Sequence, residues 1–388
     1  MASVGLEALG HRLTHDADPP ARCTGWGVEA PYDHLVDHSQ SAVDEVLLAA
    51  PRGFCAGVEM AIKSLAWMVR VFEPPVFCYH EIVHNQLIVD RFRSLGVVFV
   101  DDIAEVPEGA PLMLSAHGSA PEVVQAARQR TTIVVNAVCP LVTKVHHEVK
   151  VRSGKGYDII YVGHEGHDEA VGTMAVAPEH VRLVETPADV AALDLADDQP
   201  VAFLAQTTLS LDEWSDVLGA AKARYPQLWQ PGRSDLCYAT TNRQAALKQI
   251  AAKADAVVVI GSANSSNTVA LAKVATAMGC ARVVRVNGPD ELPADLTGTV
   301  GVTAGASAPE ELVEAVIAAL APARGATLVN VLDEDEYFPP PPELRRLLES
   351  VATLVGLATG LRAEPSAVLG DDRTHKASEV LAELVAQR

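Results

Sequence analysis

Three cysteines occupy matching positions along the sequence, and cysteine thiolates are strong metal ligands. Each cysteine stands just after a short apolar run or turn and at the head of a helix-like segment. The segments are AAPRGFCAGVEMAI around Cys55, VVNAVCPLVTKVHHEV around Cys139 and SDLCYATTNRQAAL around Cys237. If the fold brings them together, three thiolates can hold a metal centre and leave one coordination position open.

Two kinds of metal centre fit three thiolates. An iron–sulfur cluster is usually held by four cysteines, so three ligands leave one iron free to act as a Lewis acid. Zinc also accepts three thiolates plus water, although the C-x₂-C pair of compact zinc sites is absent from this sequence. The alternative is that a cysteine is a small buried hydrophobic residue. We prefer that alternative for Cys23, Cys78 and Cys280, which lie outside the matching positions.

Polar turns repeat with the cysteines. One polar turn follows each cysteine after 28 or 29 residues, and a second follows later in each segment. The first turns begin at His84, His167 and Ser265, and the second are centred on His117, Thr207 and Ser307. Because ligands of α/β sheets bind beyond the carboxyl ends of the strands, three such units would bring three thiols and six polar turns to one centre.

Several of these turns are suited to an anion. The run Ser265-Ser266-Asn267 lies between the strand-like VVVIG and the helix-like VALAKVATAM, so it offers hydroxyls, an amide and free backbone N–H groups. Ser307 stands before a second helix start, and His84 and His117 add donors that can be cationic. A single serine at such a position is explained by helix capping. The combination with two histidine turns favours an anion site.

The segment GHEGHDEAVGT offers a proton donor. A carboxyl group in a dry, partly apolar pocket has a raised pKa, so Glu169 is the candidate general acid. His167 belongs to the same turn, and Thr207 in AQTTLS is a candidate hydroxyl relay. We expect His164 to lie on the surface and Asp168 to be a solvated loop charge.

Short apolar runs alternate with helical patterns from Glu45 onward. Runs such as Asp158–Val162 predict buried strands, and segments such as Glu310–Leu320 predict helices. This alternation is typical of βαβ units and parallel sheets, so we predict an α/β protein with three pseudo-symmetric lobes. The expected divisions are an N-terminal extension over 1–44, lobes over 45–138, 139–235 and 236–345, and a helical, peripheral C-terminal extension over 346–388.

The composition narrows the class of protein. Of the 388 residues, 49% are hydrophobic and 21% charged, as in globular domains, and the net charge of −20 argues against a nucleic-acid binder. No apolar run is long enough for a membrane span, and the N-terminus lacks the pattern of a secretory signal. We therefore expect a cytoplasmic protein without disulfides.

Nine motifs occur in an order that resembles the 4-hydroxy-3-methylbut-2-enyl diphosphate reductase (LytB/IspH) family. The resemblance extends from about Glu45 to Arg345 and leaves out both ends of the chain. The motifs are PRGFCAGV, EIVHN, SAHG, CPLVTKVH, GHxGHxE, QTTLS, CYATTNRQ, NSSN and TAGASAP. Each motif alone is weak, but nine in order are specific.

The resemblance implies a trefoil of three α/β lobes around a central [4Fe–4S] cluster, one per chain, with Cys55, Cys139 and Cys237 as ligands and one open iron. It implies Glu169 as proton donor, with His167 and Thr207 lining the cavity. The implied diphosphate contacts are His84, His117, His167, Ser265, Ser266, Asn267 and Ser307.

The implied reaction is reductive dehydroxylation of (E)-4-hydroxy-3-methylbut-2-enyl diphosphate to isopentenyl and dimethylallyl diphosphate, the last step of the non-mevalonate isoprenoid pathway. A ferredoxin or flavodoxin is the expected electron donor, because the sequence has no flavin or nicotinamide fingerprint. Two alternatives on the same fold are a cluster-dependent dehydratase and a non-catalytic iron–sulfur sensor.

The sequence departs from the family pattern at three positions. Many members have proline where this chain has Asp168, a second glutamate where it has Val171, and threonine where it has Ala205. None of these changes affects an expected cluster ligand.

Overall fold

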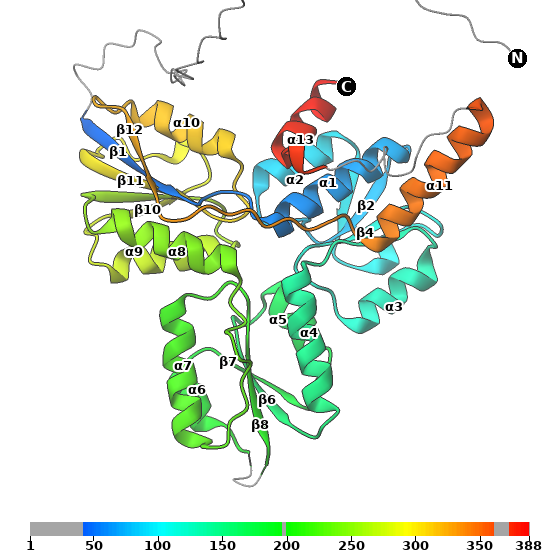
Figure 1. The fold of residues 1–388 in the computed structure, drawn as a ribbon, viewed down its shortest axis with the longest axis horizontal. Coiled ribbons are helices and arrows are strands. Elements are labelled where there is room, and N and C mark those ends of the chain that lie inside the picture. The colour runs from blue at the N-terminus through cyan, green and yellow to red at the C-terminus, as the bar shows by residue number, and fades with distance from the viewer. Residues whose placement is uncertain (1–41, 196–198, 361–371, 388) are drawn as a thin grey trace, which may run out of the picture. The chain divides into compact units, whose positions relative to one another are not determined.

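The computed structural model describes residues 42–195, 199–360 and 372–387. Within these residues the chain forms three separate parallel sheets, of four, three and five strands, each packed with helices (Figure 1). The prediction of an α/β protein with three parallel-sheet lobes is therefore confirmed. The expected extension over 1–44 lies outside the described residues except for its last three positions, of which Val43 and Asp44 belong to strand β1.

The first sheet has the strand order β3-β2-β4-β5, all parallel. Its strands are β2 (Val76–Tyr79), β3 (Val97–Val100), β4 (Leu112–Leu114) and β5 (Val134–Asn136). The helices of this part of the chain are α1 (Ala56–Val71), α2 (Gln86–Ser94) and α3 (Pro121–Arg130), with a 3-10 turn at Ile103–Glu105.

The second sheet has the order β7-β6-β8 and is also parallel. Its strands are β6 (Asp158–Val162), β7 (Val181–Val184) and β8 (Val201–Ala205). The accompanying helices are α4 (Pro140–Ser153), α5 (Asp168–Met174), α6 (Pro187–Ala192) and α7 (Leu211–Arg224).

The third sheet has the order β10-β9-β11-β1-β12. Its strands are β1 (Val43–Ala50), β9 (Ala256–Ile260), β10 (Val283–Val286), β11 (Gly298–Ala304) and β12 (Ala326–Asn330). The helices are α8 (Tyr238–Ala251), α9 (Ser266–Ala277) and α10 (Glu310–Leu320), with a 3-10 turn at Pro289–Glu291. The interior strand β9 reads AVVVI and is buried along its whole length, which is typical of a parallel strand covered on both faces.

Strand β1 shows that sheet membership does not follow chain order. It precedes the helices of the first sheet, yet it pairs in parallel with β11 and β12 of the third. The segment 45–138 therefore begins with a strand of the third sheet, and β1 carries the chain from that sheet to the first cysteine. The lobe boundaries given above stay a prediction.

The C-terminal segment differs from the sequence prediction. Helices α11 (Pro342–Thr359) and α13 (Ala377–Ala386) follow a helical pattern, as expected, with a 3-10 turn at Asp372–Thr374. They are not peripheral, however, because Leu344 of α11 and Leu381 of α13 are fully buried in the core of the first sheet. The backbone N–H of Ala377 also donates to Glu59 Oε2 of α1 at 2.8 Å.

No described helix is long and apolar enough to cross a membrane.

We predict that Leu381→Ala destabilises the protein, because truncating a fully buried leucine removes apolar contacts and leaves a cavity. The expected loss is about 2–5 kcal/mol in the free energy of unfolding, measured by urea titration. Leu357→Ala on α11 is the matched control, since that side chain is 78% exposed. Equal stabilities for the two variants would contradict the packing of α13 on α1.

Candidate functional site

The three cysteines are equivalent in the structure as well as in the sequence. Cys55, Cys139 and Cys237 are the N-cap residues of α1, α4 and α8. The backbone N–H of each donates to a carbonyl in one of the second polar turns. The acceptors are Ala306 for Cys55, Ala116 for Cys139 and Thr207 for Cys237, at 3.0–3.2 Å. The same hydrogen bond thus recurs in all three repeats and ties each thiol to a polar turn.

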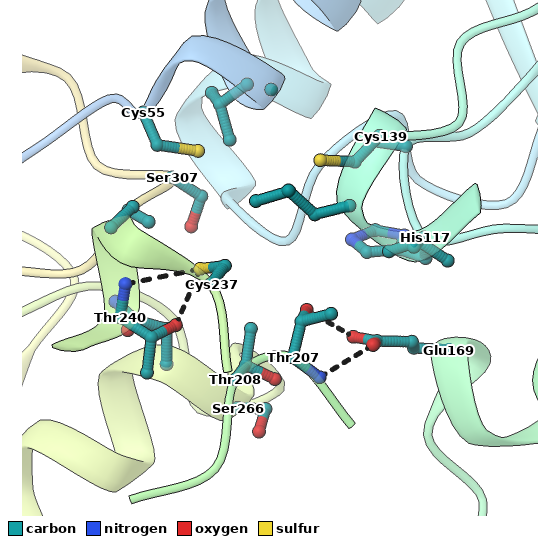
Figure 2. A pocket seen from close by; sticks show the side chains of 18 of the residues that line it. Cys55, His117, Cys139, Glu169, Thr207, Thr208, Cys237, Thr240, Ser266 and Ser307 are labelled. Carbon is teal, nitrogen blue, oxygen red and sulfur yellow. Dashed lines mark hydrogen bonds between the residues drawn. The ribbon is translucent and has the colours of Figure 1, made fainter. Parts of the chain in front are cut away.

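These residues line one cavity, which encloses about 780 Å³ including its open mouth. Figure 2 shows the thiols of Cys55 and Cys139 pointing toward one another across it. Every candidate site residue from the sequence lines this cavity. They are Cys55, Cys139, Cys237, His84, His117, His167, Glu169, Thr207, Ser265, Ser266, Asn267 and Ser307.

The thiols are held in a poorly solvated space. Burial raises the pKa of Cys139 well above its usual range, and burial raises the pKa of Cys237 to about 11. A charge on Cys55 raises both pKa values further, so three neighbouring thiolates repel one another. The Cys237 sulfur is oriented by the backbone N–H of Thr240, which donates to it at 3.2 Å. A positively charged metal centre would relieve this repulsion.

The spacing of the thiols bears on the kind of metal centre. Two thiolates on a tetrahedral zinc ion lie about 3.8 Å apart, given a Zn–S bond of about 2.3 Å. Among the described residues, only His84, His117 and Asp168 bring three candidate ligand atoms within 4.8 Å of one another, so the three sulfurs are spread more widely. Gly57 keeps space open between them, because a Cβ there would lie 2.9 Å from Cys139 Sγ and 3.8 Å from Cys55 Sγ. The arrangement fits a group larger than one ion.

Glu169 is a buried carboxyl group bound to Thr207. Its Oε1 accepts the Thr207 backbone N–H at 2.7 Å, and its Oε2 accepts the Thr207 hydroxyl at 3.0 Å (Figure 2). Burial raises the pKa of Glu169 to about 7, although the two Thr207 bonds act in the opposite direction. This carboxyl group can therefore hold a proton near neutral pH, as a general acid must.

His167 caps the helix that carries Glu169. Its Nδ1 accepts the backbone N–H of Glu169 at 3.1 Å, so Nε2 carries the hydrogen of the neutral ring. Burial, followed by the charge of His84, lowers the pKa of His167 to about 4. A neutral His167 therefore serves as a hydrogen-bond donor in the cavity.

His84 and His117 form a stacked pair, with ring centroids 3.8 Å apart and an interplanar angle of 12°. Asp168 Oδ2 lies 3.8 Å from His84 Nε2 and 3.7 Å from His117 Nδ1, and Asp168 Oδ1 lies 3.0 Å from His80 Nδ1. Burial alone would raise the pKa of Asp168, but the His80 bond and the nearby histidine charges hold it at about 2. The expectation of a solvated loop charge at Asp168 is thus wrong.

The cluster of His84, His117 and Asp168 is better suited to an anion than to a metal ion. An imidazole binds a metal through a lone pair in the plane of its ring, and two parallel stacked rings cannot both aim such lone pairs at one ion. Burial lowers the pKa of His117 well below its usual range, and its buried Nδ1 has no hydrogen-bond partner. A ligand with acceptor oxygens would satisfy this nitrogen.

The serine turns differ from one another. Ser265 caps α9 through its bond from the Thr268 N–H at 3.4 Å, and Ser307 donates to the His84 carbonyl at 2.9 Å. Asn267 is buried in the cavity wall, and neither atom of its amide group has a partner. Since buried amides are normally hydrogen-bonded, Asn267 points to a polar ligand.

Several features of the site were missed by the sequence reading. Gly57, Thr208 and Phe338 also line the cavity. Gly57 lies in the motif PRGFCAGV and Thr208 in the motif QTTLS, so the motifs could have indicated both residues. His164 is not a plain surface residue, because its Nδ1 lies 3.4 Å from the Ser266 hydroxyl and its Nε2 is 3.9 Å from Glu213 Oε1.

Two of the three departures from the family pattern lie away from the cavity. Val171 is 49% exposed on α5, and Ala205 is buried within β8. Only Asp168, through its contacts with the histidines, touches the site itself.

Comparison with known proteins agrees with this geometry. The family model described as "LytB protein" matches residues 46–321. The chain belongs to the LytB family. Members of this family depend on an iron–sulfur group, and they are enzymes.

Similar proteins from other organisms are named as diphosphate reductases. A "4-hydroxy-3-methylbut-2-enyl diphosphate reductase" of Rhodopirellula baltica is 48% identical over 306 residues, covering 78% of this chain and 96% of the relative. A Streptomyces avermitilis protein of the same name is 45% identical over 333 residues, covering 84% and 98%. The solved "E-1-hydroxy-2-methyl-but-2-enyl-4-diphosphate reductase" of Plasmodium falciparum matches with a TM-score of 0.77 and 30% identity, covering 80% and 99%.

We predict that Glu169→Gln stabilises the protein at alkaline pH. The folded state raises the pKa of Glu169 from its ordinary value of 4.5 to about 7. Between these two pH values only the unfolded chain releases the proton, so the wild type loses stability as pH rises from about 4.5 to about 7, while glutamine has no proton to lose. A glutamine can still accept the Thr207 N–H and donate to the Thr207 hydroxyl. The expected advantage of the variant grows from near zero at pH 4 to on the order of 2–3 kcal/mol at pH 8, by urea unfolding. A constant difference across this range would contradict the raised pKa.

Proposed function

We propose that this chain catalyses the reductive dehydroxylation of (E)-4-hydroxy-3-methylbut-2-enyl diphosphate to isopentenyl and dimethylallyl diphosphate. The observation that carries the proposal is a single cavity that combines three cysteines, a buried carboxyl group with a raised pKa, and several anion-type turns. The reaction consumes two electrons and two protons and releases water. The names of the relatives support the same activity.

The proposed cofactor is one [4Fe–4S] cluster per chain, held by Cys55, Cys139 and Cys237, with one iron open. Its support is the spread of the thiols, the space above Gly57 and the mutual repulsion of the thiolates. When bound, such a cluster supplies electrons and a Lewis-acid position facing the cavity.

The proposed diphosphate site lies beside the thiols. Its contacts are His84, His117, His167, Ser265, Ser266, Asn267 and Ser307. The N-terminus of α9 contributes free backbone N–H groups there, and Asn267 contributes an amide without another partner. These donors hydrogen-bond and orient the diphosphate, which places the hydroxylated end of a short substrate toward the cysteines.

Glu169 is the proposed proton donor. It holds its proton near pH 7, and its two bonds from Thr207 fix the carboxyl group at the cavity wall. The poorly solvated surroundings keep bulk water from supplying protons at random positions. Glu169 therefore delivers a proton to the reacting end of the substrate, with Thr207 and His167 holding the carboxyl group and its helix in place.

We predict that the anaerobically reconstituted protein oxidises reduced viologen when given the hydroxylated diphosphate. Cys139→Ser should abolish the activity, and Glu169→Gln should reduce kcat by about 10²–10⁴-fold, the usual contribution of a general acid. Product formed without dye oxidation would indicate a dehydratase. Tight pyrophosphate binding without product would indicate a sensor, and either result would overturn the proposed activity.

A second prediction concerns Gly57→Ala. The added methyl group would lie 2.9 Å from Cys139 Sγ, in the space proposed for the cluster. Alanine normally stabilises a helix relative to glycine by about 0.5–1 kcal/mol, so the fold should persist. We expect iron and acid-labile sulfide per chain to fall at least severalfold with an unchanged circular dichroism spectrum. Full iron and sulfide content would contradict the proposed position of the cluster.

Two expectations from the sequence stay predictions. A ferredoxin or flavodoxin is the proposed electron donor, and the cytoplasm is the proposed cellular location.

A further inference from the structure

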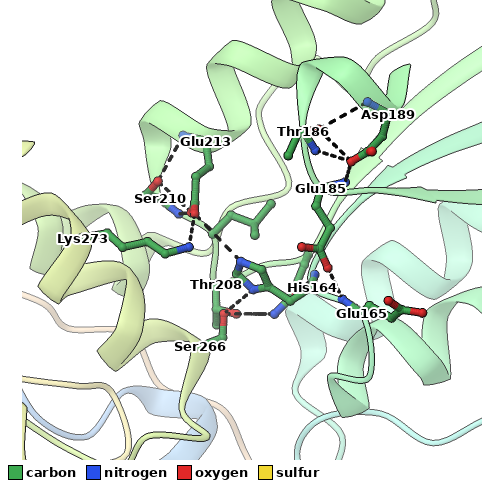
Figure 3. A network of polar contacts seen from close by, with 12 residues as sticks. His164, Glu165, Glu185, Thr186, Asp189, Thr208, Ser210, Glu213, Ser266 and Lys273 are labelled. Atoms are coloured by element: carbon green, nitrogen blue, oxygen red, sulfur yellow. Dashed lines mark hydrogen bonds and ion pairs between the residues drawn. The ribbon is translucent and has the colours of Figure 1, made fainter. Parts of the chain in front are cut away.

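Gln206 is a fully buried side chain just behind the proposed diphosphate site. It follows β8 and does not itself line the cavity. Its Oε1 accepts the backbone N–H of His164 at 2.9 Å. Its Nε2 donates to Thr208 Oγ1 at 3.0 Å and to Ser266 Oγ at 3.1 Å. Figure 3 labels the three partners of this amide, His164, Thr208 and Ser266.

The orientation of this amide follows from its neighbours. A backbone N–H can only donate, so the atom facing His164 must be the carbonyl oxygen of Gln206. The space is also tight, because a Cβ on Gly163 would lie 3.1 Å from Oε1. The NH₂ group of Gln206 must therefore face the two hydroxyl groups.

The direction of the two hydroxyls follows in turn. A hydroxyl has one hydrogen, and both hydroxyl oxygens here already accept a bond from Gln206. Their own hydrogens are left to donate elsewhere, and both side chains line the cavity. Ser266 Oγ has His164 Nδ1 as a neighbour at 3.4 Å, but a phosphate oxygen is a stronger acceptor because it is charged.

We propose that Gln206 is a positioning residue that makes Ser266 and Thr208 hydrogen-bond donors toward the substrate diphosphate. This inference rests on the proposed function and adds Thr208 to the anion contacts. Gln206 acts through the two hydroxyls and has no contact with the ligand. Its amide links the end of β8 in the second sheet to the start of α9. One NH₂ group therefore determines that both hydroxyls accept from it and donate elsewhere.

The surrounding charges support the fixed geometry. Glu213 of α7 forms an ion pair with Lys273 of α9 and lies 3.9 Å from His164 Nε2. Figure 3 shows this chain of contacts ending at Ser266. The His164 backbone, which fixes the Gln206 amide, is thus held beside α9.

The test is the binding of inorganic pyrophosphate to the anaerobically reconstituted protein, followed by calorimetry. Four proteins form a cycle: wild type, Gln206→Met, Thr208→Val with Ser266→Ala, and all three changes together. We expect Gln206→Met to weaken binding by about 10-fold, as two donors lose their preferred direction. In the background without the two hydroxyls, the same change should alter Kd by less than about twofold.

The control is Gln244→Met. Gln244 is also buried and its amide is also hydrogen-bonded, but to two backbone groups, the Leu211 N–H and the Leu209 carbonyl, both at 3.0 Å. It contacts neither hydroxyl, so we expect similar destabilisation in urea and an unchanged pyrophosphate Kd.

Three outcomes would overturn the inference. Equal effects of Gln206→Met with and without the hydroxyls would mean that it does not act through them. An equal loss of affinity in Gln244→Met would reduce Gln206 to a structural role. Absence of pyrophosphate binding by the wild type would overturn the proposed diphosphate site as well, which distinguishes failure of the proposed function from failure of this inference.

Discussion

Burial from water is the constraint on which the chemistry of the cavity depends. Loss of solvent disfavours charge of either sign, so it raises the pKa of Glu169 and of two thiols and lowers the pKa of His117 and His167. The acid thereby holds its proton and the histidines become neutral N–H donors. Asp168 keeps its charge because His80 donates to it. A charged ligand entering this space meets directed donors in place of mobile water.

The three sheets create this constraint together. A parallel sheet has its polar loops at the carboxyl ends of its strands, and one sheet alone would expose them to solvent. Here the backbone N–H of each cysteine donates to a carbonyl of a polar turn, and this hydrogen bond recurs in all three repeats. The thiols and the turns of all three sheets therefore line one cavity. Strand β1 belongs to the third sheet and ends only a few residues before the first cysteine, so it connects that sheet directly to the cavity.

The sequence was informative wherever residue type alone decides the role. The cysteines, Glu169 and the serine turns could be named because few other residues perform their chemistry, and their repeat implied a common centre. Asp168 and His164 were misassigned because their surroundings come from distant segments, at His80 and at Glu213. The burial of α13 was missed for the same reason, since its apolar face is covered by α1 and nothing in its own pattern identifies that partner.

The direction of hydrogen bonds cannot be predicted from the sequence motifs at all. The motif QTTLS contains four polar side chains, but it does not say which of them accepts a hydrogen bond and which donates one. That assignment begins at the His164 N–H, whose polarity is fixed by the backbone, passes through the amide of Gln206 and ends at two hydroxyl hydrogens. The first two steps each permit a single assignment, because neither a backbone N–H nor an amide nitrogen can accept a hydrogen bond, and the two hydroxyls that accept from Gln206 keep their hydrogens to donate. An anion site can therefore be specified by a residue that never touches the anion, since the residue decides where the hydrogens of its neighbours point.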